Sequence, residues 1–242
     1  MENVDLKKYD VVFNVAGTAQ RKETMENAHL YYEVNEHLVV DLARKAKNDG
    51  VKQFIVLSSM SVYGKNEGFI TKTTEPCPNT HYGISKLSAD EEIKKLSDEH
   101  FKVAVVRPPM VYGSGCQGNY QTLRKFALST LIFPKYKNER SMIYVGNLAE
   151  FIKLVVDNDA DGLFLPQNAE YVNTTELVDV IAGLHGRKVI LTNLFDPFVW
   201  VAKKINVTIM KKVFGNLTNE KVDCVNKFHF TESIKCSEGS DQ

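Results

Sequence analysis

The sequence predicts an α/β fold built on a doubly wound parallel sheet with helices on both faces. Short apolar runs of strand length alternate along the chain with longer segments of helical periodicity. The runs are continuously apolar, as in strands that are covered on both faces. With 242 residues, 43% of them hydrophobic, the chain can bury a sizeable core as one large domain or two small ones.

The elements follow in regular order. Residues 9–15 read as a strand, and residues 25–48 as a long helix with Leu38, Val39 and Leu42 on its apolar side. Asn173 with Glu176 resembles a capping box for a helix that Gly186 ends. Further strands are expected at 51–57, 101–106, 142–145 and 162–165, and further helices at 82–98, 119–130, 147–157 and 174–185. A polar tail is expected from Cys236 to Gln242.

Composition limits the function. Thirty basic and thirty acidic residues cancel, which provides no electrostatic footprint for nucleic acid or an anionic membrane. The four cysteines have no C-x-x-C spacing and the six histidines do not cluster, so no metal site is predicted. The charged first ten residues lack the apolar core of a signal peptide, so a cytoplasmic chain with reduced thiols is expected.

Tyr82 and Lys86 are spaced so that both lie on one face of a helix. A free tyrosine has a pKa of about 10, too high for a base at neutral pH. A neighbouring ammonium favours the phenolate, so we expect Lys86 to lower the pKa of Tyr82. A solvated helix face explains most such spacings when they occur alone.

A serine-rich segment precedes this pair. The apolar run 51–57 ends in Ser58-Ser59-Met60-Ser61, at the edge of the sheet where ligands of open α/β proteins gather. Serines also close strands and cap helices. A strand-end serine followed by Tyr-x-x-x-Lys at the start of a helix is a rarer order, and it predicts a catalytic Ser59, Tyr82 and Lys86.

On these residues the chain resembles the extended short-chain dehydrogenases/reductases, in their NAD-dependent nucleotide-sugar epimerase/dehydratase branch of the UDP-glucose 4-epimerase type. The similarity covers nearly the whole chain. Four further segments match that family in its order: 9–17, 31–35, 107–113 and 140–149. The resemblance implies a Rossmann-like part at 1–115 for NAD binding and catalysis. It implies a mainly substrate-binding part at 116–242, from which 140–157 return to the core.

The resemblance also implies roles for residues. Tyr82 would exchange a proton with a sugar hydroxyl while hydride moves to or from the same carbon, and Ser59 would hold that oxygen. The same groups serve epimerisation and ketone reduction of a UDP-hexose, for cell-surface polysaccharide synthesis. NAD is the implied cofactor, with NADP left open. Cofactor-binding positions are Val15, Ala16, Gly17, Asn35, Ser58, Tyr82, Lys86 and Pro109, and substrate-binding positions are Ser59, Met60, Ser61, Asn119 and Arg140.

The family's Gly-rich turn, which seats the cofactor pyrophosphate, has no counterpart before Tyr9. Gly113-Ser114-Gly115-Cys116-Gln117-Gly118 fits G-x-G-x-x-G literally, but Pro108 and Pro109 separate it from a strand. We read it as a substrate loop before a helix at Asn119. The chain is therefore expected to be N-terminally truncated.

The expected truncation leaves alternatives open. Val11-Val12-Phe13 would become an edge strand, which favours pairing with a missing N-terminal half. Helices 25–48 and 82–98 resemble the pair through which the family forms homodimers. The alternative function is a non-catalytic fragment that binds a nucleotide sugar or a partner chain.

Residues 195–214 repeat apolar positions at helical spacing with lysines between them. A basic amphipathic helix can lie on a membrane surface. More often such a stripe packs on its own protein. With the resemblance, a helix of the smaller substrate-covering region is favoured, and no membrane span is expected.

Overall fold

The computed structural model describes residues 4–19, 23–195 and 208–239. The chain folds as two compact units that are interleaved in sequence. Unit 1 consists of residues 1–64, 72–108 and 151–166, and unit 2 of residues 65–71, 109–150 and 167–242. The sequence predicts two functional parts, 1–115 and 116–242, with 140–157 belonging to the first. Their boundaries differ from those of the two compact units, and the functional division stays a prediction.

Unit 1 is built on a parallel sheet in the order β1-β2-β4-β8. Its strands are β1 (Val11–Asn14), β2 (Gln53–Leu57), β4 (Lys102–Val106) and β8 (Gly162–Phe164). β1 lies at the edge of this sheet, as the sequence predicts, and Phe13 on it is exposed. The α/β fold with a parallel sheet is confirmed.

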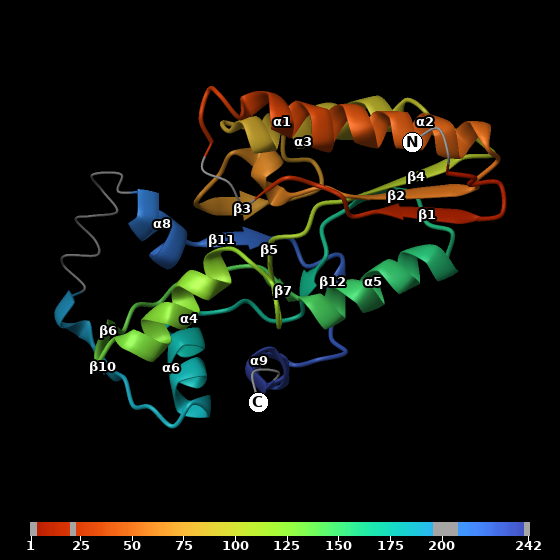
Figure 1. Cartoon of the computed structure of the whole chain (residues 1–242). Helices are drawn as coiled ribbons and strands as arrows, with labels where there is room; N and C mark the ends of the chain where they lie inside the picture. Colours follow the sequence, from red (N-terminus) through yellow and green to blue (C-terminus); the bar gives the residue numbers. More distant parts are fainter. Residues whose placement is uncertain (1–3, 20–22, 196–207, 240–242) are drawn as a thin grey trace. The chain divides into compact units, whose positions relative to one another are not determined.

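Helices cover both faces of this sheet (Figure 1). On one face lie α1 (Ala28–Tyr32), the π-helical turn η1 (Glu33–His37), α2 (Leu38–Asn48) and α3 (His81–Lys94). On the other lies the part of α5 (Val145–Asp157) that starts at Phe151. Gln53 in β2 ties that helix to the sheet, because its Nε2 donates to Val155 O at 3.0 Å. The predicted helix 25–48 is thus one run, 28–48, interrupted by a π turn.

Unit 2 combines helices with short parallel strand pairs. Its helices are α4 (Asn119–Ser129), α6 (Thr174–Leu184), α8 (Thr208–Phe214) and α9 (Phe230–Glu238). The pairs are β3 (Gly68–Ile70) with β11 (Leu217–Asn219), β5 (Met110–Tyr112) with β7 (Met142–Tyr144), β6 (Ile132–Pro134) with β10 (Ile190–Thr192), and β9 (Gln167–Asn168) with β12 (Cys224–Val225).

The cap predicted for α6 is confirmed. Asn173 Oδ1 accepts hydrogen bonds from Thr175 N at 2.9 Å and from Glu176 N at 3.2 Å, which satisfies two amides that the helix leaves unpaired. At the other end Gly186 has a φ of 67°, the left-handed conformation that commonly ends a helix.

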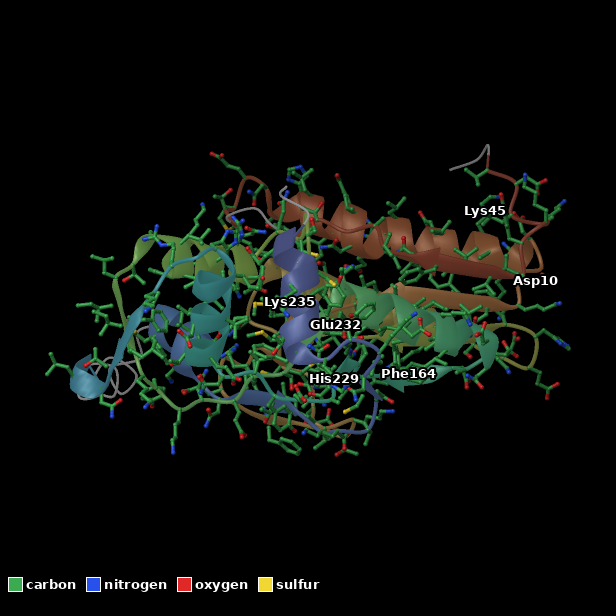
Figure 2. The ribbon with its side chains drawn as sticks, turned by 90° about the horizontal axis from the view of Figure 1, so that it is seen from below. Asp10, Lys45, Phe164, His229, Glu232 and Lys235 are labelled. Atoms are coloured by element: carbon green, nitrogen blue, oxygen red, sulfur yellow. The ribbon has the colours of Figure 1, made fainter. Side chains whose placement is uncertain are left out.

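The prediction of a polar tail from Cys236 is wrong in part, because Cys236 to Glu238 belong to α9. Ile234 is buried, and Tyr112 OH and Ser233 Oγ are hydrogen-bonded at 2.6 Å. Glu232 and Lys235 lie on the exposed side of the same helix (Figure 2). Ile234, the partly buried Phe230 and hydrogen bonds from distant positions therefore hold a helix that composition alone does not indicate.

The predicted helix 195–214 is confirmed only at its end. α8 covers 208–214, and Phe214 packs on Phe133 with ring centroids 5.7 Å apart. Phe195 instead belongs to the 3-10 turn η3 (Asn193–Phe195), and residues 196–207 lie outside the described residues. Among the helices described, none has the length and apolar character that crossing a bilayer requires. The described residues also contain no group of three potential metal ligands.

Candidate active site

Ser59 lies where β2 leaves the sheet. Ser58 N donates to Val106 O at 2.7 Å, which extends the β2–β4 ladder by one residue. Ser59 is then the N-cap of the 3-10 helix η2 (Met60–Tyr63), and its Oγ accepts a hydrogen bond from Ser61 N at 3.1 Å. Ser59 Oγ also donates to Ser61 Oγ at 3.1 Å. The capping bond fixes the Ser59 side chain at the carboxyl edge of the sheet.

Tyr82 lies in the first turn of α3, which two side chains cap. Thr80 Oγ1 accepts from Gly83 N at 3.1 Å. The Glu23 carboxylate accepts from His81 N and from Tyr82 N, each at 3.0 Å. A carboxylate is favourable at this positive end of the helix. Glu23 was missed in the sequence, because no spacing links it to a helix that begins 58 residues later in the chain.

Close packing brings the serine segment and α3 together. A Cβ at Gly83 would lie 2.7 Å from Ser61 O, so only glycine allows this approach. A side-chain interaction with Ser59 lowers the pKa of the Tyr82 phenol. Two of the three predicted catalytic residues therefore influence one another.

The electrostatics of Tyr82 differ from the expectation. Burial raises the pKa of Tyr82 above its ordinary value, and this outweighs the Ser59 hydrogen bond, which lowers it. Asp90 raises the pKa further, and Lys86 is not among the groups that shift it. The expectation that Lys86 lowers this pKa is thus wrong for the protein without ligands, because desolvation of the phenol dominates.

Lys86 is buried one helical turn from Tyr82. Its Nζ donates to Leu57 O, at the end of β2, at 3.0 Å. Burial lowers the pKa of Lys86, and the charge of Asp90 raises it. On the other side, a Cβ at Gly17 would lie 3.1 Å from Lys86 Nζ and 3.2 Å from Asn35 Oδ1. The predicted cofactor positions Gly17, Asn35 and Lys86 therefore lie together.

The π turn η1 positions Asn35. Its side chain is fully buried and binds the loop after β1 twice, accepting from Thr18 N at 2.7 Å and donating to Thr18 O at 3.0 Å. Asn35 Nδ2 also donates to Ser85 Oγ on α3 at 3.2 Å. π turns within helices frequently occur at functional sites. Val15 and Ala16 belong to the same loop, and Val15 is exposed.

A buried ion pair lies beneath these residues, and sequence reasoning missed it. Asp90 Oδ2 accepts from Arg107 Nε at 2.9 Å and from Ser58 Oγ at 2.8 Å. Arg107 Nη1 donates to Tyr63 OH at 3.0 Å. Asp90 follows Lys86 by one turn of α3, a spacing that was visible in the sequence. The network ties the serine segment, from Ser58 to Tyr63, to the helix that carries Tyr82 and Lys86.

The remaining predicted residues belong to unit 2, except Met60, whose amide donates to Pro108 O at 3.2 Å in unit 1. Pro109 is half-buried, and Asn119 is exposed at the start of α4. Arg140 Nη1 donates to Gly215 O at 2.9 Å and to Lys211 O at 3.3 Å. Burial lowers the pKa of Arg140 to about 10, so it remains a cation at neutral pH.

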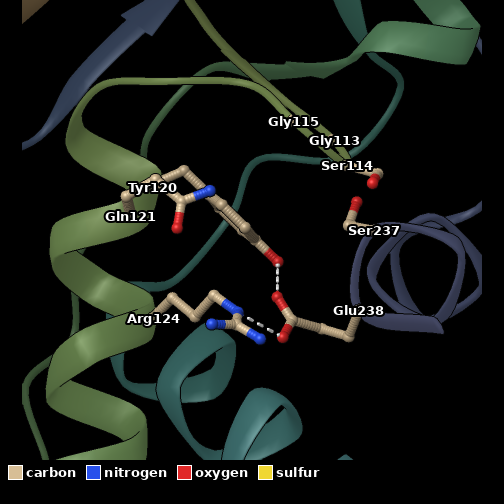
Figure 3. Close-up of a pocket in the computed structure, with 8 residues that line it drawn as sticks. All are labelled: Gly113, Ser114, Gly115, Tyr120, Gln121, Arg124, Ser237 and Glu238. Carbon is tan, nitrogen blue, oxygen red and sulfur yellow. Dashed lines mark hydrogen bonds and ion pairs between the residues drawn. The ribbon is translucent and has the colours of Figure 1, made fainter. Parts of the chain in front are cut away.

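Unit 2 contains a polar pocket of about 190 Å³ that includes none of the predicted catalytic residues. It is lined by the glycine-rich loop 113–115, by α4 and by α9 (Figure 3). Glu238 from α9 accepts from Tyr120 OH and from Arg124 Nε, each at 2.7 Å. The loop is followed by a helix that begins at Asn119, as predicted.

The sequence and structure were compared with known proteins. Residues 2–164 match the model of the NAD dependent epimerase/dehydratase family. The chain is 32% identical over 188 residues to UDP-glucose 4-epimerase of Vibrio cholerae, which covers 73% of this chain and 57% of that protein. It is 31% identical over 162 residues to N-acetyl-alpha-D-glucosaminyl-diphospho-ditrans,octacis-undecaprenol 4-epimerase of Escherichia coli O157:H7, which covers 65% of this chain and 48% of that protein.

The chain thus spans about half the length of these curated relatives. Among solved structures, UDP-glucuronic acid 4-epimerase from Bacillus cereus in complex with NAD superposes with a TM-score of 0.74 at 15% identity, over 98% of this chain and 77% of that one. At this identity the superposition shows the fold. From the family model and the first relative, the chain belongs to the NAD-dependent epimerase/dehydratase family.

Proposed function

We propose that the protein transfers hydride at a secondary alcohol or ketone of a UDP-linked hexose, as an NAD(P)-dependent 4-epimerase or 4-keto reductase. One observation carries the proposal: close packing at Gly83 brings the start of α3, which carries Tyr82, against the Ser59–Ser61 segment at the sheet edge, with Lys86 buried one turn along the helix. The family membership and the UDP-glucose 4-epimerase name of a relative support the reaction and the substrate class.

In the reductive direction Tyr82 acts as the acid. Its raised pKa keeps the phenol protonated at neutral pH, so it can donate a proton to a keto oxygen as hydride reaches the same carbon. Ser59 donates a hydrogen bond to that oxygen and stabilises the charge that develops on it. In the oxidative direction Tyr82 takes the hydroxyl proton back. Ser61, which contacts Ser59, orients the sugar.

The residues around Gly17 fit a nicotinamide ribose. Asn14 Nδ2 is buried at the end of β1 and has no hydrogen-bond partner among the described residues. Of the three N–H donors of Lys86, Leu57 O takes one within the described part of the chain. Both groups suit ribose or carboxamide oxygens, with Val15, Ala16, Gly17, Asn35, Ser58 and Pro109 as further contacts. Bound NAD would supply the hydride acceptor and a positive charge.

Arg140 and Asn119 are the proposed substrate contacts in unit 2, with Met60 in unit 1. Arg140 is a cation whose described hydrogen bonds go to main-chain carbonyls, so its charge is available to the diphosphate. The negative charge of Glu67 raises the pKa of Arg140 and so favours its charged form. A guanidinium in this position suits a UDP-sugar better than a neutral sugar.

We also propose a cytoplasmic enzyme of cell-surface polysaccharide synthesis. The four cysteines are free thiols, which suits a reducing compartment. One relative is named for an undecaprenol-linked sugar, which supports the pathway class. For the assembly we propose a homodimer through α1–α2 and α3, or pairing of the exposed β1 edge with another chain.

The test is turnover of a UDP-hexose by the purified chain with NAD, followed by chromatography of the sugar nucleotides. Tyr82→Phe should lower the rate by about 10²–10⁴-fold, the usual contribution of a positioned acid or base. The control is Tyr9→Phe, because Tyr9 is half-exposed at the far end of β1. Turnover that survives Tyr82→Phe would contradict the assignment. Calorimetry that detects the UDP-sugar but no NAD would favour a non-catalytic binding protein.

A further inference from the structure

Unit 2 exposes a group of aliphatic side chains around β6 and β10. Ile132 and Ile190 are register partners on these two parallel strands, and Ile190 N donates to Leu131 O at 2.9 Å. Leu194 follows in η3. Just before η3, the carbonyl oxygen of Thr192 accepts a hydrogen bond from Lys135 N at 2.9 Å, which joins β10 to the end of β6. The exposed fractions are 69% for Leu131, 47% for Ile132, 64% for Ile190 and 81% for Leu194. We call these four residues the β6–β10 patch.

The two sequence segments that carry this patch are basic. Residues 122–138 and 183–195 contain no aspartate or glutamate. Their exposed charged residues are basic: Lys125, Lys135, Lys137, Arg187 and Lys188. Glu139 and Asp196 directly follow these two segments, so the basic run ends there. The chain as a whole is neutral, so this basic character is local.

Exposed aliphatic side chains on segments that also carry exposed lysine and arginine are the pattern of a surface that lies on an anionic bilayer. The apolar side chains enter the boundary between headgroups and acyl chains, and the basic ones remain among the phosphates. A second copy of this chain fits less well. An isologous contact would bring the same basic residues together, and like charges in contact disfavour it.

We propose that the β6–β10 patch docks unit 2 on the surface of a membrane that contains anionic phospholipid. The contact is peripheral, since it needs no spanning helix. It does not depend on the hydride-transfer chemistry, whose residues Ser59, Tyr82 and Lys86 belong to unit 1. The protein would then work on substrates at the membrane face as well as in solution.

The experiment is co-sedimentation of the full chain with vesicles of phosphatidylcholine, with and without phosphatidylglycerol. Binding is expected only with phosphatidylglycerol, and it should fall as salt is raised. Ile132→Ser/Ile190→Ser should lower the vesicle partition coefficient by at least about tenfold, because both side chains lose their acyl contact. Val222→Ser is the matched control, an exposed aliphatic residue of unit 2 outside the patch.

A second pair of variants tests the charge. Lys125→Gln/Lys188→Gln should weaken binding by about 25-fold, since each basic residue near an anionic surface contributes about a fivefold factor. Lys235→Gln on the exposed side of α9 should change binding little. Circular dichroism must show all variants folded, which is expected for exposed positions. Failure of the wild-type chain to sediment, sedimentation unaffected by the isoleucine variant, or patch-dependent self-association in light scattering would overturn the proposal.

Discussion

Replacing Asp90 by asparagine should destabilise unit 1 far more than any surface substitution. The change keeps the size of the side chain and removes its charge, so the guanidinium of Arg107 remains buried without its counter-ion. Both side chains are almost inaccessible, at 1% exposed for Asp90 and 3% for Arg107. Tyr63 OH still accepts from Arg107, but a neutral hydroxyl does not compensate a buried charge.

The geometry sets the size of the effect. At the N–O distance of 2.9 Å, an effective dielectric constant of about 20 gives a gross attraction of about 6 kcal/mol. Desolvation of both ions offsets much of this, and removal of one partner from buried pairs typically costs about 3–5 kcal/mol. With a urea m-value of about 2–3 kcal/mol/M, the midpoint should fall by more than about 1 M.

The assay is urea unfolding at pH 7, followed by circular dichroism, for Asp90→Asn, Arg107→Gln and the double variant. We expect the double variant to be more stable than the sum of the singles predicts, by about 2–3 kcal/mol, since neither charge is then left alone. Glu92→Gln is the control on the same helix, because Glu92 pairs with Lys95 in an exposed position and should matter little.

A competing interpretation gives a different result. Burial raises the pKa of Asp90, while Arg107 and the Ser58 hydrogen bond lower it. If burial prevailed at neutral pH, Asp90 would already be uncharged and Asp90→Asn would cost no more than the Glu92 control. That outcome, or strict additivity in the cycle, would refute a charged network beneath the candidate site.

Three further outcomes are expected in unit 2. Gly183→Ala should stabilise the protein by about 0.5–1 kcal/mol in urea unfolding, because glycine weakens a helix interior and nothing lies within 4 Å of the added Cβ. Asn173→Ala should lower the unfolding free energy by about 1–2 kcal/mol through loss of the α6 cap. Burial raises the pKa of Glu238, but hydrogen bonds from Tyr120, His185 and Arg124 together lower it by more. The pKa in the folded protein therefore lies below that in the unfolded chain. Stability from this group is therefore complete above the unfolded pKa of about 4.3 and is lost as pH falls through the lower folded value. Glu238→Gln should reduce the fall in the thermal unfolding midpoint between neutral and acid pH. The same pH dependence in the variant and the wild type would contradict a stabilising Glu238 carboxylate.

Much of unit 1 could be predicted because its signals are local. The apolar runs that become β2 and β4 are continuous, and the strands of this sheet pair in parallel, as the alternation with helices predicts. Asn173 as a helix cap also follows from neighbouring residues. The meeting of Ser59 and Tyr82 follows from a strand end and a helix start that share one edge of a sheet.

The parts that were missed depend on contacts between distant residues. α9 is held by Tyr112 through Ser233 and by Tyr120 through Glu238, partners that are 121 and 118 residues apart in sequence. The pairs β3–β11 and β9–β12 likewise join short segments with no apolar run of their own. Spacing also indicated that Lys86 faces Tyr82, but the sign of the net pKa shift depends on burial, which spacing does not reveal.

The raised pKa of Tyr82 bears on how the candidate site changes direction. Burial raises the pKa of Tyr82, and the negative charge of Asp90 raises it further, so Tyr82 remains a phenol at neutral pH. A proton donor suits reduction, whereas oxidation of a sugar hydroxyl requires the phenolate. We infer that the extra positive charge that favours the phenolate must enter with a bound molecule, so that the base forms only once the site is filled.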